Sequence, residues 1–400
     1  MKIERTIKRI IGLTLIPLSF IVPRNKKIWL FGSNMGYTGN AKYLFLHIYS
    51  NYKDKIKAYW ITDKKEEKEN LQSLGLPVAY KWSLRGIIYS LQAKLYLFNS
   101  YVSDINEYTF GNVVRFNLWH GVALKHIERT KKNPEKKYTT RNPFIKFRYF
   151  RFLVRPSYVL SSSPIQTELF AKSFGVSEDR CVEGTYPRNE ILKLDKRDLQ
   201  KFIDRYEYST GLPDIVEKIE TYDHCIIYMP TWRDSGRNFL DQIELDLIRL
   251  NSSLKKINGC MLFKLHPATK LNVNLDNLTN IILLDTGIDI YPLLPWTDCL
   301  VTDYSSIYFD YVLMENKKII LYIPDIKEYT TGDRDFAFPF EESVDGEKIY
   351  SFEKLLTSLE TLGKKDTGID RKKLKKFWDP KLVGNDQIVR FVSEKINLQL

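Results

Sequence analysis

Four polar segments of the sequence follow apolar runs, each at the point where a buried strand is expected to end. They carry His120, Thr231 and Arg233, Lys264 and His266, and Thr302, Ser305 and Ser306. Arginine can grip a phosphate through parallel hydrogen bonds, and lysine adds a point charge. A histidine that titrates near neutral pH can take a proton from an attacking hydroxyl. Each segment alone has a structural explanation, but together they predict one shared site for a substrate with several negative oxygens.

The segment Leu300–Met314 indicates how such a site would be built. Its apolar start breaks into the polar residues TDYSS (302–306), and apolar residues then recur at helical spacing. This pattern predicts a strand, a polar corner and a helix. A helix N-terminus has unpaired N–H donors and partial positive charge, so it suits a phosphate. An ordinary N-cap is the alternative explanation for the two serines.

Strands and helices are predicted to alternate along both halves of the 400-residue chain. In the first half, the expected strands are 27–31, 56–62, 95–98, 112–119 and 158–162, with helices at Ala41–Tyr49 and Pro164–Phe174. In the second half, they are 225–230, 260–267, 280–285, 299–303 and 318–324. Such alternation is typical of parallel sheets covered by helices on both faces. We therefore predict an α/β protein with two doubly wound parallel-sheet domains facing a cleft, and ligands at the carboxyl ends of the strands.

The expected domain boundaries follow from composition. Residues 1–26 form a basic apolar segment, 27–192 the first domain, 193–222 a charged helical connection, and 223–400 the second domain. A last helix near Asp386–Asn397 could cross back to the first domain. The glycine-rich loop 32–40 is not GxGxxG, so the dinucleotide-binding fingerprint is absent.

Lys and Arg number 61 against 49 Asp and Glu, which gives a formal net charge of +12. This basic balance favours an anionic partner, whether nucleic acid, a membrane surface or a phosphorylated substrate. The four cysteines are far apart and form no CxxC, as expected for reduced thiols without a zinc site. No motif indicates a tightly bound cofactor or metal. The scattered Asp303, Asp310 and Asp325 leave room for a loosely held Mg²⁺ but give it no support.

Two segments combine basic and apolar residues. In residues 1–26, Lys and Arg flank the apolar run Ile10–Val22, which is shorter than the about 20 residues that span a bilayer. In Lys136–Pro156, cations such as Lys146, Arg148 and Arg151 alternate with phenylalanines, and no acid is present. We predict that both segments lie on an anionic membrane surface. Packing on the protein's own core is the alternative for each, and binding of single-stranded nucleic acid is a further one for the second.

The polar motifs also occur in the order found in a known family. WHGVALK (119–125), MPTWRD (229–234), FKLHP (263–267), TDYSSIYFDYVLMENKKIILYIPD (302–325) and FGSNMGYTGNAKYLF (31–45) resemble the CDP-glycerol glycerophosphotransferase family of teichoic acid and capsule polymer synthesis. The resemblance covers most of residues 27–395. It implies two Rossmann-like domains in the GT-B arrangement, peripheral on the cytoplasmic face of the cell membrane. It also implies transfer of glycerol phosphate from CDP-glycerol, or of another polyol phosphate from its CDP-polyol, to a polyprenyl-linked saccharide acceptor, with release of CMP.

The resemblance further implies roles for residues at the matching positions. His120 would be the base that acts on the acceptor hydroxyl, and His266 would lie near the donor phosphates. Donor contacts are assigned to Thr231, Arg233, Lys264, Thr302, Ser305, Ser306 and Asp310, and acceptor or membrane contacts to Asn40, Lys42, Lys125, Lys146, Arg148 and Arg151. Two departures concern Val122-Ala123, where the family often has Thr-Pro, and the stretch around Arg334, which lacks the usual following Pro-Gly.

Other function classes stay open at this point. A GT-B glycosyltransferase acting on a nucleotide-sugar would use many of the same groups. A nucleic-acid-binding protein is disfavoured because no RRM, KH or helix-turn-helix signature is present. An inert membrane adaptor would not explain two histidines at strand ends. The sequence does not fix glycerol against ribitol phosphate, one added unit against many, or the oligomeric state.

Overall fold

The computed structural model describes residues 2–207, 210–233, 245–266, 277–332, 335–362 and 371–400, and the single residues 243, 269 and 369. The chain divides into two compact units. The first unit comprises Met1–His120, Ile127–Glu190 and Lys376–Leu400, and the second comprises Gly121–His126 and Ile191–Lys375. Each unit is built on a sheet in which all paired strands are parallel, so the predicted α/β class with two parallel sheets is confirmed.

The sheet of the first unit has seven strands in the order β3-β2-β1-β4-β5-β6-β7. Their bounds are β1 Asn25–Gly32, β2 Lys57–Thr62, β3 Val78–Tyr80, β4 Ala93–Phe98, β5 Val114–Asn117, β6 Tyr158–Ser161 and β7 Cys181–Glu183. Every strand predicted for this half is present. The prediction missed β3 and β7, each of which has only three residues.

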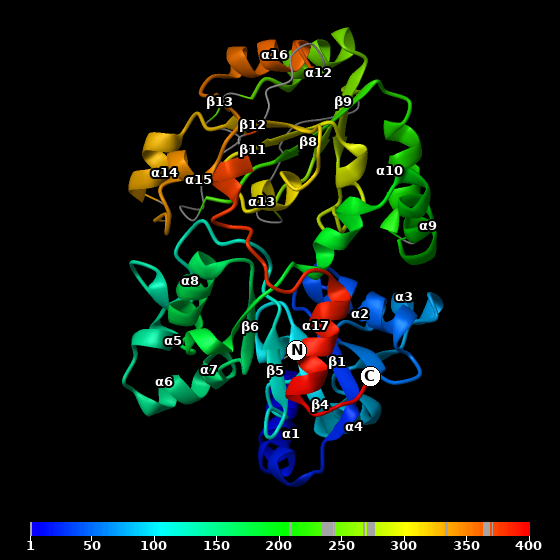
Figure 1. Ribbon diagram of the computed structural model, residues 1–400, viewed down its shortest axis with the longest axis vertical. Helices are drawn as coiled ribbons and strands as arrows, with labels where there is room; N and C mark the ends of the chain where they lie inside the picture. The colour runs from blue at the N-terminus through cyan, green and yellow to red at the C-terminus, as the bar shows by residue number, and fades with distance from the viewer. Residues whose placement is uncertain are drawn as a thin grey trace. The chain divides into compact units, whose positions relative to one another are not determined.

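Helices cover both faces of this sheet (Figure 1). From α2 (Gly39–Asn51), Phe45 packs against Phe31 and Trp60, with ring centroids 5.5 and 5.9 Å apart. From α4 (Leu84–Gln92), Tyr89 stacks on Tyr59 at 4.1 Å. Tyr59 and Trp60 are neighbours in β2 and point to opposite faces. The α2 and α4 helices therefore lie on opposite sides of the sheet.

The first unit also contains the helices α3 (Lys65–Ser73), α8 (Pro164–Phe174) and α17 (Asn385–Lys395). The last of these comes from the end of the chain and packs beside α2. There the Asp386 carboxylate accepts a hydrogen bond from the Tyr52 hydroxyl at 2.8 Å and lies 2.7 Å from His47 Nε2. The chain thus returns to its first unit after it has built the second.

The sheet of the second unit has six strands in the order β10-β9-β8-β11-β12-β13. Their bounds are β8 His224–Met229, β9 Gly259–Phe263, β10 Ile281–Leu283, β11 Cys299–Thr302, β12 Lys318–Tyr322 and β13 Glu347–Ile349. All five predicted strands are present, and the short β13 was missed. The helices are α9 Lys196–Tyr206, α10 Leu212–Ile219, α12 Leu247–Lys256, α13 Ile307–Tyr311, α14 Ile326–Gly332, α15 Phe340–Ser343 and α16 Phe352–Glu360.

One face of this sheet packs on α12 and α16. The buried core joins alternate residues of four strands, among them Tyr228, Phe263, Val301 and Tyr322, to leucines of both helices. The two helices are also linked at the surface, where Arg249 forms two hydrogen bonds with the carboxylate of Glu353. Residues that alternate along these strands face the two helices, and the strands are buried on both faces.

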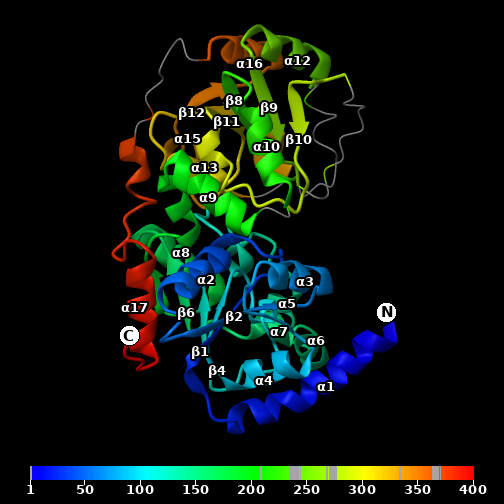
Figure 2. The same ribbon diagram turned by 90° about the vertical axis from the view of Figure 1, so that its right-hand side faces the viewer.

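The basic apolar segment at the N-terminus forms one helix, α1 (Lys2–Ile21), which runs alongside α4 in Figure 2. Its inner side packs on the first unit: Leu15 and Ser19 are buried, and Lys8 donates to the Tyr80 hydroxyl at 3.2 Å. Arg24, which the sequence placed among the membrane-facing cations, is instead bonded to backbone carbonyls of the unit, including those of Ser90 and Thr109. No described helix has the length and apolar character needed to cross a bilayer.

The second basic segment, Lys136–Pro156, does not form one continuous helix. It forms three short helices, α5 (Lys136–Thr139), α6 (Pro143–Arg148) and α7 (Phe150–Leu153). Asn142 caps α6 by accepting from the Phe144 and Ile145 amides, and a proline follows it. Because the residue before a proline disfavours helix, Asn142 ends one helical stretch and starts the next.

Candidate active site

Each sheet reverses its strand order at an internal switch point, between β1 and β4 in the first unit and between β8 and β11 in the second. In open α/β sheets, ligands bind beyond the carboxyl ends of strands at such a point. His120 follows β5, the neighbour of β4. Arg233 follows β8, and Ser305 follows β11. These predicted residues therefore lie at the expected edge of their own sheets.

In the second unit, Arg233 is buried between two carboxylates, with only 2% of its side chain exposed. Its Nε and Nη2 donate to the two oxygens of Asp325 at 2.8 and 3.1 Å. Its Nη1 donates to Asp303 Oδ2 at 2.9 Å and to the Thr231 carbonyl at 2.6 Å. Burial opposes the charged guanidinium, but the two carboxylates outweigh it and raise the pKa of Arg233. The arginine therefore stays charged and ties β8, β11 and β12 together at their carboxyl ends.

Aromatic rings complete this arrangement. Tyr304 and Tyr329 stack with centroids 3.9 Å apart, and the Arg233 guanidinium lies 5.1 and 4.8 Å from the two rings. The Tyr304 hydroxyl donates to Asp325 Oδ1 at 3.2 Å, and Lys125 Nζ lies 5.0 Å from the Tyr329 ring. The ion-pair network is therefore held by ring packing as well as by charge.

The Asp303 carboxylate also orders the loop that follows β8. It accepts hydrogen bonds from the Thr231 amide at 2.9 and 3.0 Å and from the Tyr304 amide at 2.5 Å. The Thr231 hydroxyl is buried and has no hydrogen-bond partner among the described residues. Ser305 and Ser306, at the entrance of α13, are only partly buried. Of these three predicted donor contacts, Ser305 and Ser306 are partly open to solvent, whereas the Thr231 hydroxyl is enclosed.

His266 is exposed and stacks on Trp232, with ring centroids 5.3 Å apart and planes inclined by 28°. Trp232 stands between Thr231 and Arg233, so the loop after β8 brings the imidazole of the next strand end to the same edge. The neighbouring Asp234 and Pro267, and Arg334 of the departing motif, lie outside the described residues.

Three predicted donor contacts have supporting roles in the structure. Lys264 Nζ donates to the carbonyls of Asp285, Thr286 and Ile288 at 2.8, 2.9 and 2.7 Å, and burial lowers its pKa to about 8. The Thr302 hydroxyl is buried and donates to the Met229 carbonyl at 2.7 Å.

Asp310 is also fully buried and accepts from the Tyr291 hydroxyl at 2.6 Å. These three residues hold loops and strand ends in place. Their direct contact with a donor stays a prediction that this geometry does not favour, because their polar atoms already serve the protein's own backbone and side chains.

In the first unit, His120 lies between two residues with positive φ, Trp119 at 51° and Gly121 at 122°. A tryptophan in this region is strained, and such strain is often found at functional sites. The Trp119 indole is buried against Phe174, with centroids 4.8 Å apart, and its ring centroid lies 3.8 Å from that of His120. Packing of the tryptophan thus turns the histidine outward, where it is exposed.

Two asparagines hold the loop that carries His120. Asn40 is fully buried and donates to the carbonyls of Leu118 and Trp119 at 3.1 and 2.9 Å. Asn99, directly after β4, accepts from the Ala41 amide at 2.9 Å, and its own carbonyl lies 3.5 Å from His120 Nδ1.

Asn40 was predicted to contact acceptor or membrane, and Lys42 likewise. Lys42 is fully buried, with its ammonium 5.1 Å from the Tyr37 ring. Neither side chain reaches the surface, so this burial does not favour contact with a membrane. Contact with an acceptor stays a prediction. Lys125, the third member of this group, belongs to the second unit, where it pairs with Phe336 in an antiparallel bridge.

The pKa of His120 lies below its ordinary value of about 6.5. Protein atoms crowd the imidazole and disfavour its charged form, and the nearby Arg188 guanidinium adds repulsion. Part of the ring is nevertheless open to solvent. The imidazole is therefore neutral at pH 7 and reachable, as a general base must be.

Sequence reasoning missed Asp303, Asp325, Tyr304 and Asn99 as site residues. It treated the aspartates as scattered, whereas Asp303 and Asp325 meet on Arg233. The available signal was position: each follows a strand directly or within a few residues. Among the described residues, no three His, Cys, Asp or Glu side chains gather as ligands of a metal ion would.

A family model for CDP-glycerol:poly(glycerophosphate) glycerophosphotransferases matches residues 14–382. The match spans both units and every strand end described above. The chain belongs to this family.

Curated relatives of this family member include two teichoic acid enzymes. A teichoic acid poly(glycerol phosphate) polymerase from Bacillus spizizenii is 26% identical over 90% of this chain and 87% of that protein. A teichoic acid glycerol-phosphate transferase from Staphylococcus aureus is 25% identical over 90% of each. Among solved structures, the wall teichoic acid polymerase TagF matches with a TM-score of 0.73 at 22% identity, over 99% of this chain and 96% of that one. At this identity, the TagF likeness shows the fold alone.

We expect replacement of Arg233 by methionine to lower the free energy of unfolding by about 3–5 kcal/mol, because two carboxylates are left without their buried partner. Urea unfolding monitored by tryptophan fluorescence would measure the change. Arg249→Met is the matched control: it removes a two-pronged pair with Glu353 that is exposed, for which about 1 kcal/mol or less is expected. Equal losses in the two variants would contradict the assigned burial of the Arg233 pair.

We also expect Arg188→Gln to raise the pKa of His120, since one positive charge that opposes protonation is removed. NMR titration of isotope-labelled histidines, with His120→Gln used for assignment, would follow the shift. Arg180→Gln, at an exposed arginine of the same unit, should leave the value unchanged. An unchanged or lower pKa in the Arg188 variant would show that Arg188 does not act on this imidazole.

Proposed function

We propose that this protein transfers a polyol phosphate, with glycerol phosphate as the first candidate, from its CDP-activated form to a hydroxyl of a lipid-linked saccharide acceptor. CMP is the second product. One observation carries the proposal: an accessible, neutral imidazole follows β5 in a chain that matches the glycerophosphotransferase family model over residues 14–382. The relatives' names point to the same chemistry, since they denote polymerases and transferases of glycerol phosphate.

In the proposed reaction, the acceptor hydroxyl oxygen attacks the phosphorus that carries the glycerol. A new P–O bond forms as the bond to the CMP oxygen breaks, and the hydroxyl proton passes to the His120 imidazole. Little covalent work is left to the protein, because positioning and charge stabilisation dominate phosphoryl transfer. A base with a lowered pKa is in its proton-accepting form at neutral pH.

The second unit supplies the donor site in this proposal. Ser305, Ser306 and His266 are its accessible polar residues at the switch point, and the Thr231 hydroxyl lies buried at the same edge without a partner among the described residues. Arg233 has committed its hydrogen bonds to Asp303, Asp325 and the Thr231 carbonyl. We therefore assign Arg233 to positioning the loop after β8, so that the hydroxyls can face the diphosphate.

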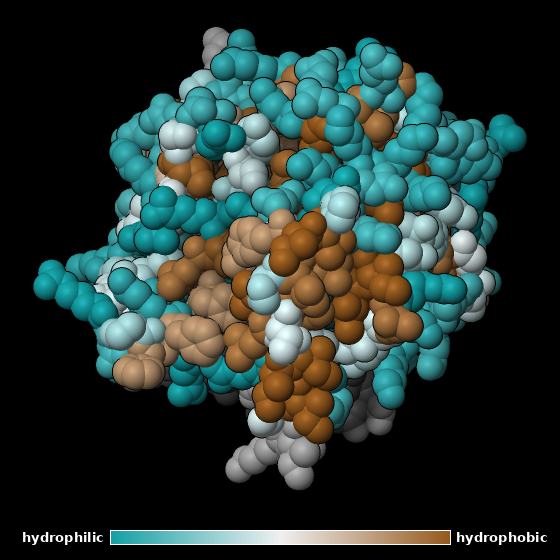
Figure 3. Space-filling model, turned by 90° about the horizontal axis from the view of Figure 1, so that it is seen from below, coloured by the Kyte–Doolittle hydropathy of each residue, from teal (hydrophilic) through white to brown (hydrophobic). Residues whose placement is uncertain are grey.

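Attachment to a membrane surface is part of the proposal, because a lipid-linked acceptor is confined there. The first unit exposes apolar side chains from three helices, which gather on the face seen in Figure 3. The apolar membrane-docking face, as we name it, consists of Ile7, Ile10, Ile11, Leu18, Phe20 and Ile21 of α1, Leu84 and Ile88 of α4, and Phe144 and Phe147 of α6. The guanidinium of Arg9 lies 5.6 Å from the Phe147 ring, so α1 and α6 meet directly.

Cations border this face. Lys146 and Arg148 of α6 are exposed, as predicted for membrane-facing residues, and Arg85 of α4 is exposed as well. Arg151 is half-buried and lies 4.6 Å from the Phe152 ring. Apolar side chains framed by lysine and arginine favour a peripheral position on an anionic bilayer surface. We place the protein on the cytoplasmic face, where CDP-activated donors are available to it.

The direct test is CMP release from a panel of CDP-glycerol, CDP-ribitol and UDP-sugars with a lipid-linked acceptor. We expect turnover with a CDP-polyol and at least a hundredfold loss of kcat in His120→Ala and His266→Ala, because general-base catalysis contributes about 10²–10⁴-fold. Turnover with a UDP-sugar instead would favour a glycosyltransferase, the runner-up that shares this fold class.

His47→Ala and His224→Ala are the matched controls for these variants. His47 pairs with Asp386 on α2, and His224 begins β8 at the end opposite to Arg233. Both should keep near-normal turnover. Full activity in His120→Ala or His266→Ala, with folding intact, would remove that residue from the mechanism.

Membrane attachment has its own test, in cosedimentation with vesicles that contain anionic lipid. We expect Leu84→Glu and Phe144→Glu each to weaken binding several-fold, since each loses buried apolar area and adds a repelled charge. Ile248→Glu changes an equally exposed apolar residue, 71% against 76% for Leu84, on α12 of the second unit, and should bind as the wild type does. Equal binding by all variants would contradict docking through this face.

A further inference from the structure

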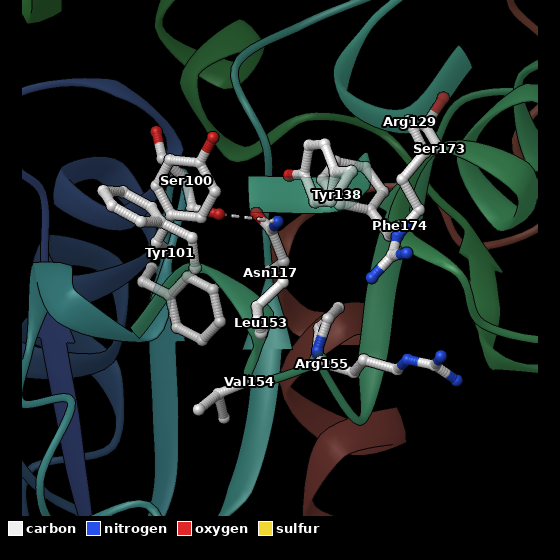
Figure 4. Close-up of a pocket in the computed structure, with 13 residues that line it drawn as sticks. Ser100, Tyr101, Asn117, Arg129, Tyr138, Leu153, Val154, Arg155, Ser173 and Phe174 are labelled. Carbon is white, nitrogen blue, oxygen red and sulfur yellow. Dashed lines mark hydrogen bonds between the residues drawn. The ribbon is translucent and has the colours of Figure 1, made fainter. Parts of the chain in front are cut away.

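A pocket lies within the first unit, apart from the switch-point residues already described. It has about 350 Å³ of space not filled by atoms, part of which is open to solvent. Its lining comes from the carboxyl ends of β4 and β5, from Arg129 and Tyr138, from the segment 152–156 after α7, and from the end of α8. Figure 4 shows Tyr101 on one side of Asn117 and Arg129 and Arg155 on the other.

Two guanidinium groups line this pocket without a counter-charge. Neither Arg129 nor Arg155 donates a hydrogen bond or forms an ion pair from its guanidinium among the described residues. Arg129 is half-buried, with its guanidinium 4.8 Å from the Tyr138 ring. An arginine pair of this kind, in a partly enclosed and aromatic setting, is suited to a phosphate.

The aromatic wall of the pocket is held in place by a buried ion pair. The Glu128 carboxylate accepts hydrogen bonds from the Tyr101 hydroxyl at 2.7 Å and from the Tyr138 hydroxyl. Lys137 is 5% exposed, donates to the Tyr101 hydroxyl at 3.1 Å and lies 3.6 Å from Glu128. Because the positive charge of Lys137 offsets the negative charge of Glu128, the two arginines, which have no ion-pair partner in the described part of the chain, give the pocket a positive charge. Its wall is rigid before any ligand arrives, which reduces the entropy lost on binding.

The pocket shares its supports with His120. The Asn117 side chain donates to the Ser100 carbonyl at 3.1 Å and accepts from the Trp119 amide at 2.8 Å. Phe174 lines the pocket and packs on Trp119, the residue that stacks on His120. A ligand held here would therefore lie next to the strand end from which the proposed base projects.

The pocket also adjoins the apolar membrane-docking face. Segment 152–156 continues from α6 and α7, whose Phe147 and Phe150 rings stack with centroids 6.1 Å apart. Phe147 belongs to the docking face, and Phe152 lines the pocket. If a molecule is anchored in the bilayer by a lipid tail, the part of its head group next to the tail would therefore contact this pocket.

We propose that this pocket binds the phosphate and the adjoining sugar of the lipid-linked acceptor, with Arg129 and Arg155 on the phosphate. The inference rests on the proposed function and deepens it. The pocket holds the membrane-proximal end of the acceptor, while the hydroxyl at the other end is left free to reach His120. The recognised chemistry is a sugar phosphate, and its source is the membrane-anchored acceptor.

The test compares Arg129→Gln and Arg155→Gln with the full-length wild type in steady-state assays. Loss of one charged hydrogen-bond partner should raise the KM for the lipid-linked acceptor about tenfold, with the KM for CDP-glycerol unchanged. Arg180→Gln is the control, since it removes the same charge from an exposed site of the same unit and leaves the pocket intact. An acceptor KM within twofold of the wild type in both pocket variants would overturn the proposal.

A binding measurement separates this inference from the proposed activity. Glucose 1-phosphate and inorganic phosphate, followed by calorimetry without lipid, serve as soluble probes. We expect glucose 1-phosphate to bind the wild type more tightly than phosphate does, and to lose this binding in Arg129→Gln. If no CDP-polyol releases CMP, the proposed function fails. Loss of glucose 1-phosphate binding in Arg129→Gln would still support the proposed pocket. Equal binding of the sugar phosphate to wild type and variant would overturn the pocket in either case.

Discussion

The Arg233 guanidinium, buried between Asp303 and Asp325, is the interaction on which the second unit's site depends. Three strands end at this point, and each contributes one member of the network. A buried charge of this kind is unfavourable unless its partners are placed well, because desolvation opposes the attraction between the groups. Here hydrogen bonds to both carboxylates and to the Thr231 carbonyl, together with two aromatic rings, surround the guanidinium. The loop of Thr231 and Trp232 has its shape because this network fixes both of its ends.

His120 in the first unit is placed by different means. No ion pair holds it; a strained tryptophan, two asparagines and a glycine define the turn after β5. Hydrogen bonds of neutral side-chain amides give the loop its shape, and crowding by protein atoms, with added repulsion from Arg188, lowers the pKa of the ring. The two units therefore stabilise their strand ends in contrasting ways, one through opposite charges and one through neutral amides.

Much of the fold could be predicted from apolar runs. All ten predicted strands occur, whereas β3, β7 and β13, each of three residues, were missed. Site residues could be located by their position after strands, but their partners could not. Nothing in the sequence tells that Arg233 turns inward to Asp325, 92 positions later, instead of outward to a ligand. The burial of Lys42 could not be predicted for the same reason, because the sequence does not distinguish a lysine covered by aromatic rings from a lysine in solvent.

The short segment Gly121–His126 has a consequence for how this chain can be divided. It leaves the first unit directly after His120, and its backbone pairs with residues 335–337 of the second unit. The His126 amide donates to the Asp335 carbonyl at 3.1 Å, and the Ala337 amide donates to the Leu124 carbonyl at 2.9 Å. Together with the C-terminal residues that return to the first unit, this interleaving means that no single cut yields two intact halves. One unit of such a protein therefore cannot be replaced by the matching unit of a relative as a single continuous segment. The two units must be inherited together, and they must be engineered together.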